Sequence, residues 1–364
     1  MRPMGIRGAI LVAVLLVAQA CAKRAPAPRE AAGFPLLEFE LTATARKLMD
    51  DDAKAWVKGD VLHEGLRMRG VALRLKGQRT LRPLGEKPSL KLRMDKGQHK
   101  GRTLLGRTAW TLDNLVEDPS MMRAHLAYKL ATAVGLAAPT TRYVRVRIDG
   151  RDEGIYLLVD AIDDAFLERH FGSAKGPLYE GEYGCDVKVG KTDCFDLESG
   201  KDPERTQIVA LTERVADGAP LWEGAEPVFS LEHLALVLAF GAYVGDFDGY
   251  HQAHNYRLYR NPQDGRWNII LSGLDRVFIK RLPPFSGAGI LAKRCFEAAP
   301  CREAYRTAWK RIGEAATELD PKGTAERLSK VMPDAQKPDA EQLDSQAQTL
   351  QSYLENQQPQ IGAR

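Results

Sequence analysis

Two stretches in the first third of the chain alternate regularly between apolar and polar residues. Residues 66–76 end in VALRLK, and residues 89–95 read SLKLRMD. This period of two predicts a pair of strands, each with one apolar and one polar face. The segment between them contains several Gly and Pro residues, which predicts a loop. On the second strand the alternation places Lys91 on the face opposite Leu90 and Leu92.

A helix is expected after these strands, because Asp118 followed by Pro119 is a typical helix start. Apolar residues then recur at every fourth position, and Gly135 predicts the end of the helix. The same patterns predict strands over 143–149 and 155–159, and helices over 162–171, 301–316 and 339–356. Residues 172–201 are rich in Gly and Asp, so we expect an ordered surface loop there.

A strongly apolar helix is predicted over residues 231–244, with the Ser230 side chain as its N-cap. Most residues of this segment are apolar, which indicates a buried helix. The helix ends just before Asp246 and Asp248. It would therefore deliver both carboxylates to one place.

A β-hairpin is predicted directly after these two aspartates. Residues 255–259 and 267–271 read as short strands, and the connecting segment contains NPQDG, a typical turn composition. The first strand begins at Asn255, and the second runs out toward Asp275. We therefore expect Asn255 and Asp275 to lie at the same end of the sheet.

The polar residues around this hairpin are of the kind that holds a hard cation. Asp248 and Asp275 supply carboxylates and Asn255 supplies an amide oxygen. Mg²⁺ prefers a few such ligands together with phosphate oxygens. The arrangement is the one that phosphoryl transfer needs.

The order of several motifs resembles the CotH kinase family, which contains secreted atypical protein kinases. The matching motifs are Lys87-Pro88-Ser89-Leu90-Lys91, Asp118-Pro119-Ser120-Met121-Met122-Arg123, Gly154-Ile155-Tyr156-Leu157-Leu158, His254-Asn255-Tyr256, Asp264-Gly265-Arg266-Trp267 and Leu274-Asp275, together with Asp248. They span roughly residues 66–280. The resemblance implies an α+β, bilobal kinase-like fold over 34–356, with a strand-rich small lobe over about 34–110 and a mixed, more helical large lobe over about 111–356.

The resemblance also implies transfer of the ATP γ-phosphoryl group to Ser or Thr of an exported protein. Asp248 would then be the catalytic residue that orients the substrate hydroxyl. Asn255 and Asp275 would hold Mg²⁺ or Mn²⁺. The ATP phosphates would be bound by Lys91, with Lys76, Arg79 and Arg123 as further candidates.

One departure from the family pattern leaves other functions open. The family usually carries Trp-Asp-Leu-Asp where this chain has Ser272-Gly273-Leu274-Asp275, so one carboxylate and one indole are missing. A catalytically inactive binding protein of the cell envelope is the first alternative. The second is a metal-dependent hydrolase in which Asp248, His251 and His254 hold zinc.

The N-terminal segment predicts export. Residues 1–20 contain two arginines followed by an apolar run, as in signal peptides, and Cys21 resembles the modified cysteine of bacterial lipoproteins. Residues 21–33 read as a Pro/Ala-rich tether and residues 357–364 as a disordered tail. We expect a bacterial envelope protein held on a membrane by lipid at Cys21, on the periplasmic or outer-membrane face, or secreted.

The remaining cysteines and the net charge agree with this location. Cys185, Cys194, Cys295 and Cys301 form two pairs that are close in sequence, so bridges within each pair are the simplest of three connectivities. Zinc bound by the four thiolates is the alternative. The formal net charge of +4 is too small to indicate a nucleic-acid partner.

Overall fold

The computed structural model describes residues 33–77, 81–96, 99–224, 227–332 and 337–357. Several sequence predictions fall outside these residues: the signal peptide, the tether with Cys21, Arg79, and the tail beyond Gln357. Residues from Phe34 onward form one compact unit.

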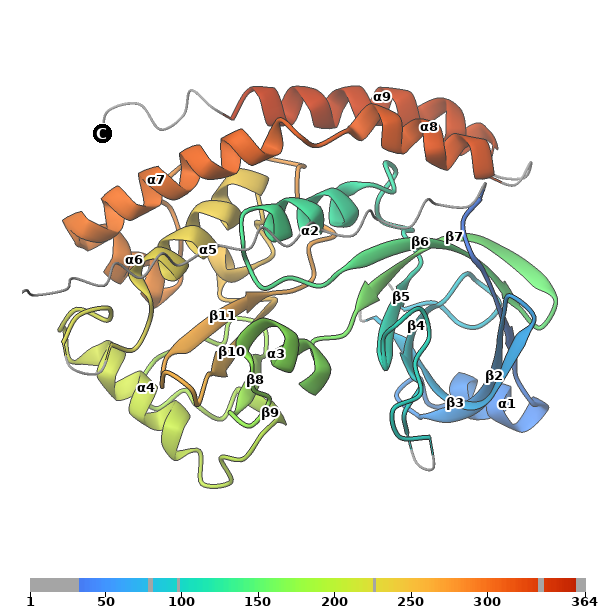
Figure 1. Cartoon of the computed structure of the whole chain (residues 1–364), viewed down its shortest axis with the longest axis horizontal. Helices are drawn as coiled ribbons and strands as arrows, with labels where there is room; N and C mark the ends of the chain where they lie inside the picture. The colour runs from blue at the N-terminus through green and yellow to red at the C-terminus, as the bar shows by residue number, and fades with distance from the viewer. Residues whose placement is uncertain (1–32, 78–80, 97–98, 225–226, 333–336, 358–364) are drawn as a thin grey trace, which may run out of the picture. The chain divides into compact units, whose positions relative to one another are not determined.

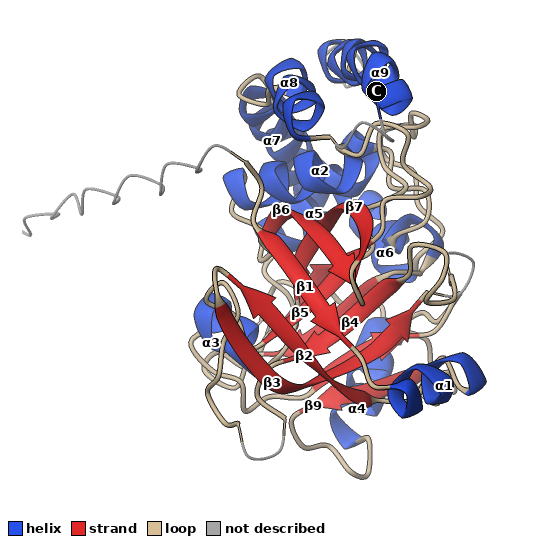
Figure 2. Cartoon of the chain, turned by 90° about the vertical axis from the view of Figure 1, so that its right-hand side faces the viewer, coloured by secondary structure: helices blue, strands red, loops and turns tan. Residues whose placement is uncertain are grey.

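Seven strands form a closed barrel in the first half of the chain (Figure 2). In order around the barrel they are β1 (Leu36–Glu40), β2 (Val57–His63), β3 (Leu66–Lys76), β4 (Ser89–Arg93), β5 (Ala109–Asp113), β7 (Arg151–Asp160) and β6 (Thr141–Ile148). The barrel closes where β1 pairs in parallel with β6. Helix α1 (Ala43–Asp51) contributes Met49 to the core inside the barrel.

The alternation of apolar and polar residues decides which side chains fill the barrel. Leu73 on β3 and Leu92 on β4 are 1% and 0% exposed, and both belong to the barrel core. Arg74 and Lys91 pair with each other in the register between these strands and alternate with the core positions. They therefore lie on the outer face of the barrel. The strand predicted over 66–76 is confirmed in full.

A second sheet of four strands has the order β11-β10-β8-β9. Its strands are β8 (Leu178–Gly181), β9 (Phe195–Ser199), β10 (Tyr256–Arg260) and β11 (Trp267–Leu271). The predicted hairpin is thus confirmed as β10 and β11. The expectation that 172–201 is only a surface loop is wrong, because β8 pairs with both β9 and β10. These strands are short, and their sequence shows little alternation.

Eight further α-helices are described: α2 (Arg123–Ala133), α3 (Asp164–Phe171), α4 (Thr206–Ala216), α5 (Leu231–Val244), α6 (Ile290–Glu297), α7 (Ala299–Ala316), α8 (Pro321–Val331) and α9 (Lys337–Glu355). Figure 1 shows α2 and α5 between the second sheet and the group of α7, α8 and α9. The apolar residues of α5 belong to the large core between these helices and the sheet. Ser230 caps α5 as predicted, since its hydroxyl accepts from the backbone N–H of His233. Among the described residues, no helix is long and apolar enough to cross a membrane.

The α+β fold class is confirmed, but two of the predicted boundaries need correction. Helix α2 begins at Arg123, because the Asp118 carboxylate accepts hydrogen bonds from the backbone N–H groups of Ser120 and Arg123 in a turn ahead of the helix. The predicted small lobe, 34–110, is too short to hold the barrel, which takes β6 and β7 from residues up to Asp160. The closing strand pair β1–β6 joins segments about a hundred residues apart, and local patterns carry no signal for such a pairing.

A partly buried histidine predicts loss of stability in acid. The Nδ1 atom of His125 lies 2.8 Å from Oγ1 of Thr141, and burial, followed by the nearby charges of Lys129 and Arg327, lowers its pKa to about 3. The unfolded chain binds a proton here below about pH 6.5, whereas the folded chain stays neutral until about pH 3. Stability should therefore fall as the pH drops through this window. In His125→Gln, thermal unfolding midpoints should fall less between about pH 7 and pH 4 than in the parent, and equal losses would contradict this assignment.

Candidate active site

The β10–β11 hairpin brings the two predicted metal ligands to one end of the second sheet. Tyr256 pairs with Leu271 in the hairpin register. One position further on, the backbone N–H of Ser272 donates to the carbonyl oxygen of Asn255 at 3.1 Å. Asn255 and Asp275 both line a single cavity. The convergence expected from the sequence is therefore present in the structure.

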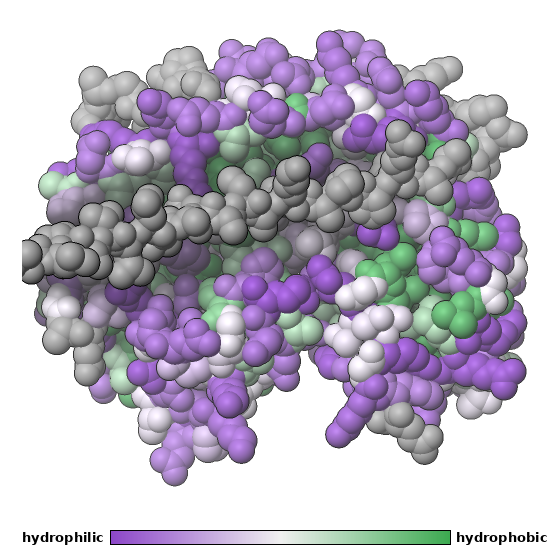
Figure 3. Space-filling model, in the orientation of Figure 1, coloured by the Kyte–Doolittle hydropathy of each residue, from purple (hydrophilic) through white to green (hydrophobic). Residues whose placement is uncertain are grey.

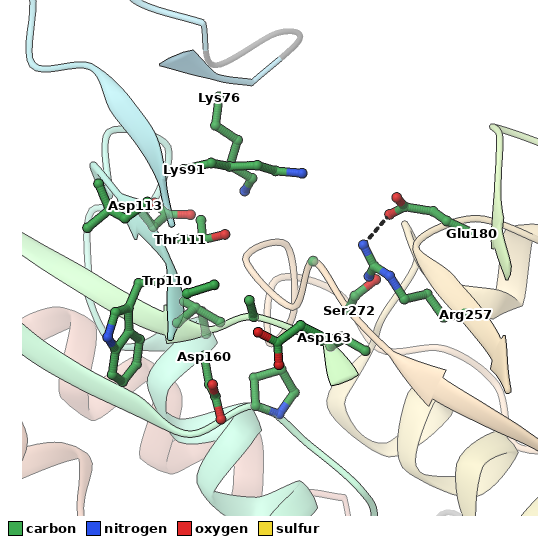
Figure 4. A pocket seen from close by; sticks show the side chains of 18 of the residues that line it. Lys76, Lys91, Trp110, Thr111, Asp113, Asp160, Asp163, Glu180, Arg257 and Ser272 are labelled. Carbon is green, nitrogen blue, oxygen red and sulfur yellow. Dashed lines mark hydrogen bonds and ion pairs between the residues drawn. The ribbon is translucent and has the colours of Figure 1, made fainter. Parts of the chain in front are cut away.

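This cavity lies between the outer face of the barrel and the second sheet, and its volume is about 320 Å³. Figure 3 shows the surface hollowed between these two parts, and Figure 4 shows the lining side chains from close by. The barrel side is formed by β3, β4, β5 and β7, and the other side by β8, β9, β10 and the loop 272–275. The volume is at the lower end of the range of about 300–1,000 Å³ for small-molecule sites. Its charged lining residues are Arg74, Lys76, Lys91, Arg93, Asp113, Asp160, Asp163, Glu180, Glu198, Arg257 and Asp275.

Positive charge gathers on the barrel wall of the cavity. Lys76 near the end of β3 and Lys91 on β4 extend into the same space in Figure 4. Burial lowers the pKa of Lys91, and the neighbouring Arg74 guanidinium lowers it further. Several cations held this close together repel one another. An anion with several oxygens, such as a polyphosphate, would relieve that repulsion.

One partly buried carboxylate, that of Asp275, lies on the facing wall in the loop that follows the hairpin. Burial, followed by the charge of the nearby Asp113 carboxylate, raises the pKa of Asp275 to about 6, although Lys76 opposes the shift. A bound divalent cation would stabilise the charged form of this carboxylate, which burial disfavours. Asn255 supplies an amide oxygen on the same wall. Amide and carboxylate oxygens fit Mg²⁺ or Mn²⁺, and a bound nucleotide would complete the ligand set.

Asp248 lies next to the cavity without lining it. The side-chain Nδ2 of Asn255 donates to the carbonyl oxygen of Asp248 at 2.9 Å. The Asp248 carboxylate is 3.3 Å from Nδ1 of His254 and 3.7 Å from Nη1 of Arg276, and 24% of its side chain is exposed. Two side chains thus hold this carboxylate at a place that a substrate hydroxyl can approach from solvent.

Arg123 does not take the place that the sequence suggested. It does not line the cavity, and its Nε atom lies 3.5 Å from Oδ1 of the buried Asp118. This ion pair ties the start of α2 to the preceding turn, which is a structural role. Arg79, the other arginine candidate, is outside the described residues.

An ion pair on the second sheet was missed by the sequence reasoning. Nη2 of Arg257 on β10 lies 2.6 Å from Oε1 of Glu180 on β8, and both residues line the cavity (Figure 4). The alternation along β10 carried a signal for Arg257, because Tyr256 and Leu258 on either side of it are buried. Glu180 was missed because β8 itself was not predicted.

The histidines near Asp248 do not form the zinc site that a hydrolase would require. His254 contacts Asp248, whereas His251 lies beside the backbone of Ser286 and near Lys280. Over the ranges that the structure describes, no three His, Cys, Asp or Glu side chains are grouped closely enough to hold a metal ion by themselves. The predicted set of Asp248, His251 and His254 is therefore not assembled.

Both predicted disulfides are present. Cys185 is bonded to Cys194 and Cys295 to Cys301, with S–S distances of 2.06 and 2.01 Å. Zinc bound by four thiolates is therefore wrong. The first disulfide closes the segment between β8 and β9, where the carbonyl oxygen of Cys185 accepts from the Tyr256 hydroxyl at 2.8 Å. This hydrogen bond links the disulfide-closed segment to β10, the first strand of the hairpin.

A cavity in which Lys76 and Lys91 face Asn255 and Asp275 is consistent with a kinase-like protein. Comparison with known proteins identifies the family. Residues 73–280, more than half of the chain, match the family described as CotH kinase protein. The chain belongs to this family, as the motif resemblance indicated.

Two relatives illustrate how far the similarity extends. Inner spore coat protein H of Bacillus subtilis is 21% identical over 292 residues, covering 71% of this chain and 78% of that protein. Invasin CotH2 of Rhizopus delemar is 25% identical over 195 residues, covering 48% of this chain and 33% of that protein. This chain thus matches only about a third of the Rhizopus protein.

The similarity also extends to a solved structure. The Helicobacter pylori proinflammatory kinase CtkA aligns over 75% of this chain and 94% of its own, with a TM-score of 0.37 and 12% sequence identity. These values are too low to support an argument about the site.

Proposed function

We propose that this chain is an ATP-dependent protein kinase that phosphorylates Ser or Thr of exported proteins. Membership of the CotH kinase family supports a kinase-like protein. The observation that carries the proposal is the cavity in which Lys76 and Lys91 face Asn255 and Asp275, with Asp248 one hydrogen bond beyond Asn255. Phosphate-binding cations, cation-binding oxygens and a candidate base are brought together there.

The chain's residues would divide the work of phosphoryl transfer among them. Lys76 and Lys91 would bind the ATP phosphates, and Asn255 and Asp275 would hold Mg²⁺ or Mn²⁺, which neutralises charge on phosphate oxygens when bound. Asp248 would accept the proton of the substrate hydroxyl. The hydroxyl oxygen then bonds to the γ-phosphorus, the bond from this phosphorus to the β–γ bridging oxygen breaks, and ADP leaves.

A non-catalytic binding protein is the second candidate function. The observation that favours it is the loop 272–275, where Ser272 and Gly273 replace the tryptophan and aspartate that the family usually carries. A site with one carboxylate fewer would retain ATP without transferring phosphate. Binding without transfer is therefore the outcome that separates the two functions.

An extracytoplasmic location is part of the proposal. Two disulfides and a spore-coat relative fit an envelope or extracellular protein. We further propose that lipid attached to Cys21 anchors the protein on a membrane. This cysteine lies outside the described residues, so the proposal stands on the sequence alone.

The type of reaction can be tested with two differently labelled substrates. The purified protein is incubated with Mg²⁺ or Mn²⁺ and ATP labelled at either the α- or the γ-phosphate, with and without an added acidic acceptor protein. The proposal predicts protein-bound label from γ-labelled ATP only. Label from α-labelled ATP would show nucleotidyl transfer instead, and no label from either would favour the binding protein.

Removing the half-buried Lys91 should weaken ATP binding. Lys91→Met retains much of the side-chain volume but loses the charge, and a lost charge-assisted hydrogen bond predicts at least about a 10-fold rise in the dissociation constant. Titration calorimetry with a non-hydrolysable ATP analogue measures the change. Lys58→Met is the matched control, since Lys58 is exposed on β2 and does not line the cavity. Equal affinities for both variants would exclude Lys91 from the phosphate site.

A further inference from the structure

The two oxygen atoms of the Asp248 carboxylate contact two different parts of the protein surface. Oδ1 is 3.3 Å from Nδ1 of His254, and Oδ2 is 3.7 Å from Nη1 of Arg276. His254 comes just before β10, whereas Arg276 comes shortly after β11. An acceptor whose hydroxyl reaches this carboxylate therefore meets protein on both sides of it.

An exposed aromatic side chain lies beyond His254. The ring of Tyr183 packs edge-on against the ring of His254, with the two centroids 4.8 Å apart, and Tyr183 is 75% exposed. Two hydrogen bonds fix the turn that carries Tyr183. The backbone N–H of Glu182 donates to the carbonyl oxygen of Cys194 at 2.9 Å, and that of Cys185 donates to the carbonyl oxygen of Glu182 at 3.0 Å. An aromatic ring held at a fixed place on the surface is typical of a contact site for another molecule.

Two cations lie beyond the other oxygen of Asp248. The Arg276 guanidinium and the Lys280 ammonium group lie over the ring of the half-buried Phe247, at 4.9 and 4.1 Å from its centroid. Arg276 also contacts Asp248, but no carboxylate among the described residues pairs with the exposed Lys280. An ammonium group has three N–H donors, and a ring on one side of it leaves donors for an anion. This part of the surface therefore offers positive charge to a bound acceptor.

The backbone that carries Lys280 is held against the end of α5. The N–H of Phe278 donates to the carbonyl oxygen of Val244 at 2.7 Å. The carbonyl oxygen of Lys280 approaches Gly245 so closely that a Cβ atom there would lie 2.1 Å from it. The φ of Gly245 is +67°, so both the close contact and the left-handed conformation require glycine. Asp248 follows three residues later, and the fold thus fixes the backbone of Lys280 relative to that of Asp248.

Tyr183 and Lys280 do not line the cavity, so both lie outside the space assigned to the nucleotide. They flank the carboxylate that would receive the substrate hydroxyl. We refer to the following four side chains as the acceptor surface: Tyr183, Phe247, Arg276 and Lys280. We propose that the acceptor surface binds protein segments in which the phosphorylated Ser or Thr has an apolar residue on one side and an acidic residue on the other. The inference rests on the proposed kinase function and names the class of its substrate.

Peptides of defined charge test this preference. Two peptides carry one Ser between a Leu and a Glu, in the two possible orders, and matched peptides carry Gln or Lys in place of Glu. Initial rates at saturating ATP and Mn²⁺ give kcat and KM for each peptide. In one of the orders, the parent protein should have a kcat/KM about five-fold higher for Glu than for Gln, mainly through KM, as for an exposed ion pair. The difference should shrink at high salt.

Charge variants of Lys280 show whether this residue causes the preference. Lys280→Gln should use the Glu and Gln peptides equally well, and Lys280→Glu should prefer the Lys peptide. A reversed preference is a result that a merely structural role of Lys280 would not produce. Lys58→Gln, on the exposed face of β2, is the matched control and should keep the parental preference. Tyr183→Ala should raise KM for peptides with Leu and leave it unchanged for peptides with Gly in place of Leu.

Peptide binding without transfer separates this inference from the proposed function. Affinity is measured by fluorescence anisotropy of labelled peptides in the presence of Mn²⁺ and a non-hydrolysable ATP analogue. Preferential binding of the Glu peptide without any phosphate transfer would overturn the kinase and support the acceptor surface. Transfer with the same peptide preference in the parent and in Lys280→Gln would overturn the acceptor surface and support the kinase. A parent protein that neither binds nor phosphorylates any of the peptides would contradict both.

Discussion

Asp248→Asn is expected to slow phosphoryl transfer at least about 100-fold while changing ATP affinity by less than about two-fold, as for loss of a general base. The reason is its position. The carboxylate lies outside the lining of the cavity and is held by His254 and Arg276. Binding of the nucleotide does not need it, whereas proton removal from the substrate does.

Initial rates of γ-phosphate transfer and calorimetric ATP affinities of the same preparations measure this separation. Asp264→Asn is a matched control on the hairpin turn, where Asp264 is exposed and its Oδ1 atom accepts from the backbone N–H of Arg266. It loses the same charge without approaching the cavity and should transfer phosphate at the parental rate. A parental rate in Asp248→Asn would remove this residue from the mechanism.

Asp275→Asn is expected to abolish the contribution of metal to ATP binding. The parent should bind the nucleotide about 10- to 100-fold more tightly with Mg²⁺ or Mn²⁺ than without, which is the size of the affinity loss when a metal site is perturbed. The variant should bind the nucleotide equally well with and without metal. Phosphoryl transfer should also be lost in Asp275→Asn. Calorimetry with the non-hydrolysable analogue, with metal and then with a chelator, gives both affinities.

The same variant should affect metal-free stability in the opposite direction. Burial and the Asp113 carboxylate raise the pKa of Asp275, so its charged form destabilises the folded protein once the pH exceeds the pKa of the unfolded chain. Asp275→Asn should therefore unfold at a higher temperature than the parent near neutral pH. Unchanged metal dependence together with a lower unfolding midpoint would show that Asp275 serves structure instead of metal binding.

The sequence predicted best those parts of the site that depend on local patterns. The hairpin turn and its two flanking strands lie within one short segment, so the convergence of Asn255 and Asp275 followed from strand pairing alone. The outward position of Lys91 followed from alternation with Leu90 and Leu92, which fill the barrel.

Features that depend on distant contacts were not predictable in the same way. The barrel closes where β1 pairs with β6, and these two strands are about a hundred residues apart in the sequence. Strand β8 pairs with β10, which lies nearly eighty residues further along the chain. Glu180 enters the cavity only through that pairing. The start of α2 was misplaced because Asp118 can cap a turn as well as a helix, and only its hydrogen bonds to Ser120 and Arg123 decide between them.

The most direct test of the central claim is mass spectrometry of an acceptor protein after incubation with the purified chain, ATP and Mn²⁺. The account predicts phosphoserine or phosphothreonine that forms with the parent and with Asp264→Asn, and that is absent with Asp248→Asn and Asp275→Asn. An acceptor left unmodified by a parent protein that binds ATP and Mn²⁺ would contradict the kinase assignment and identify the chain as a nucleotide-binding member of the family.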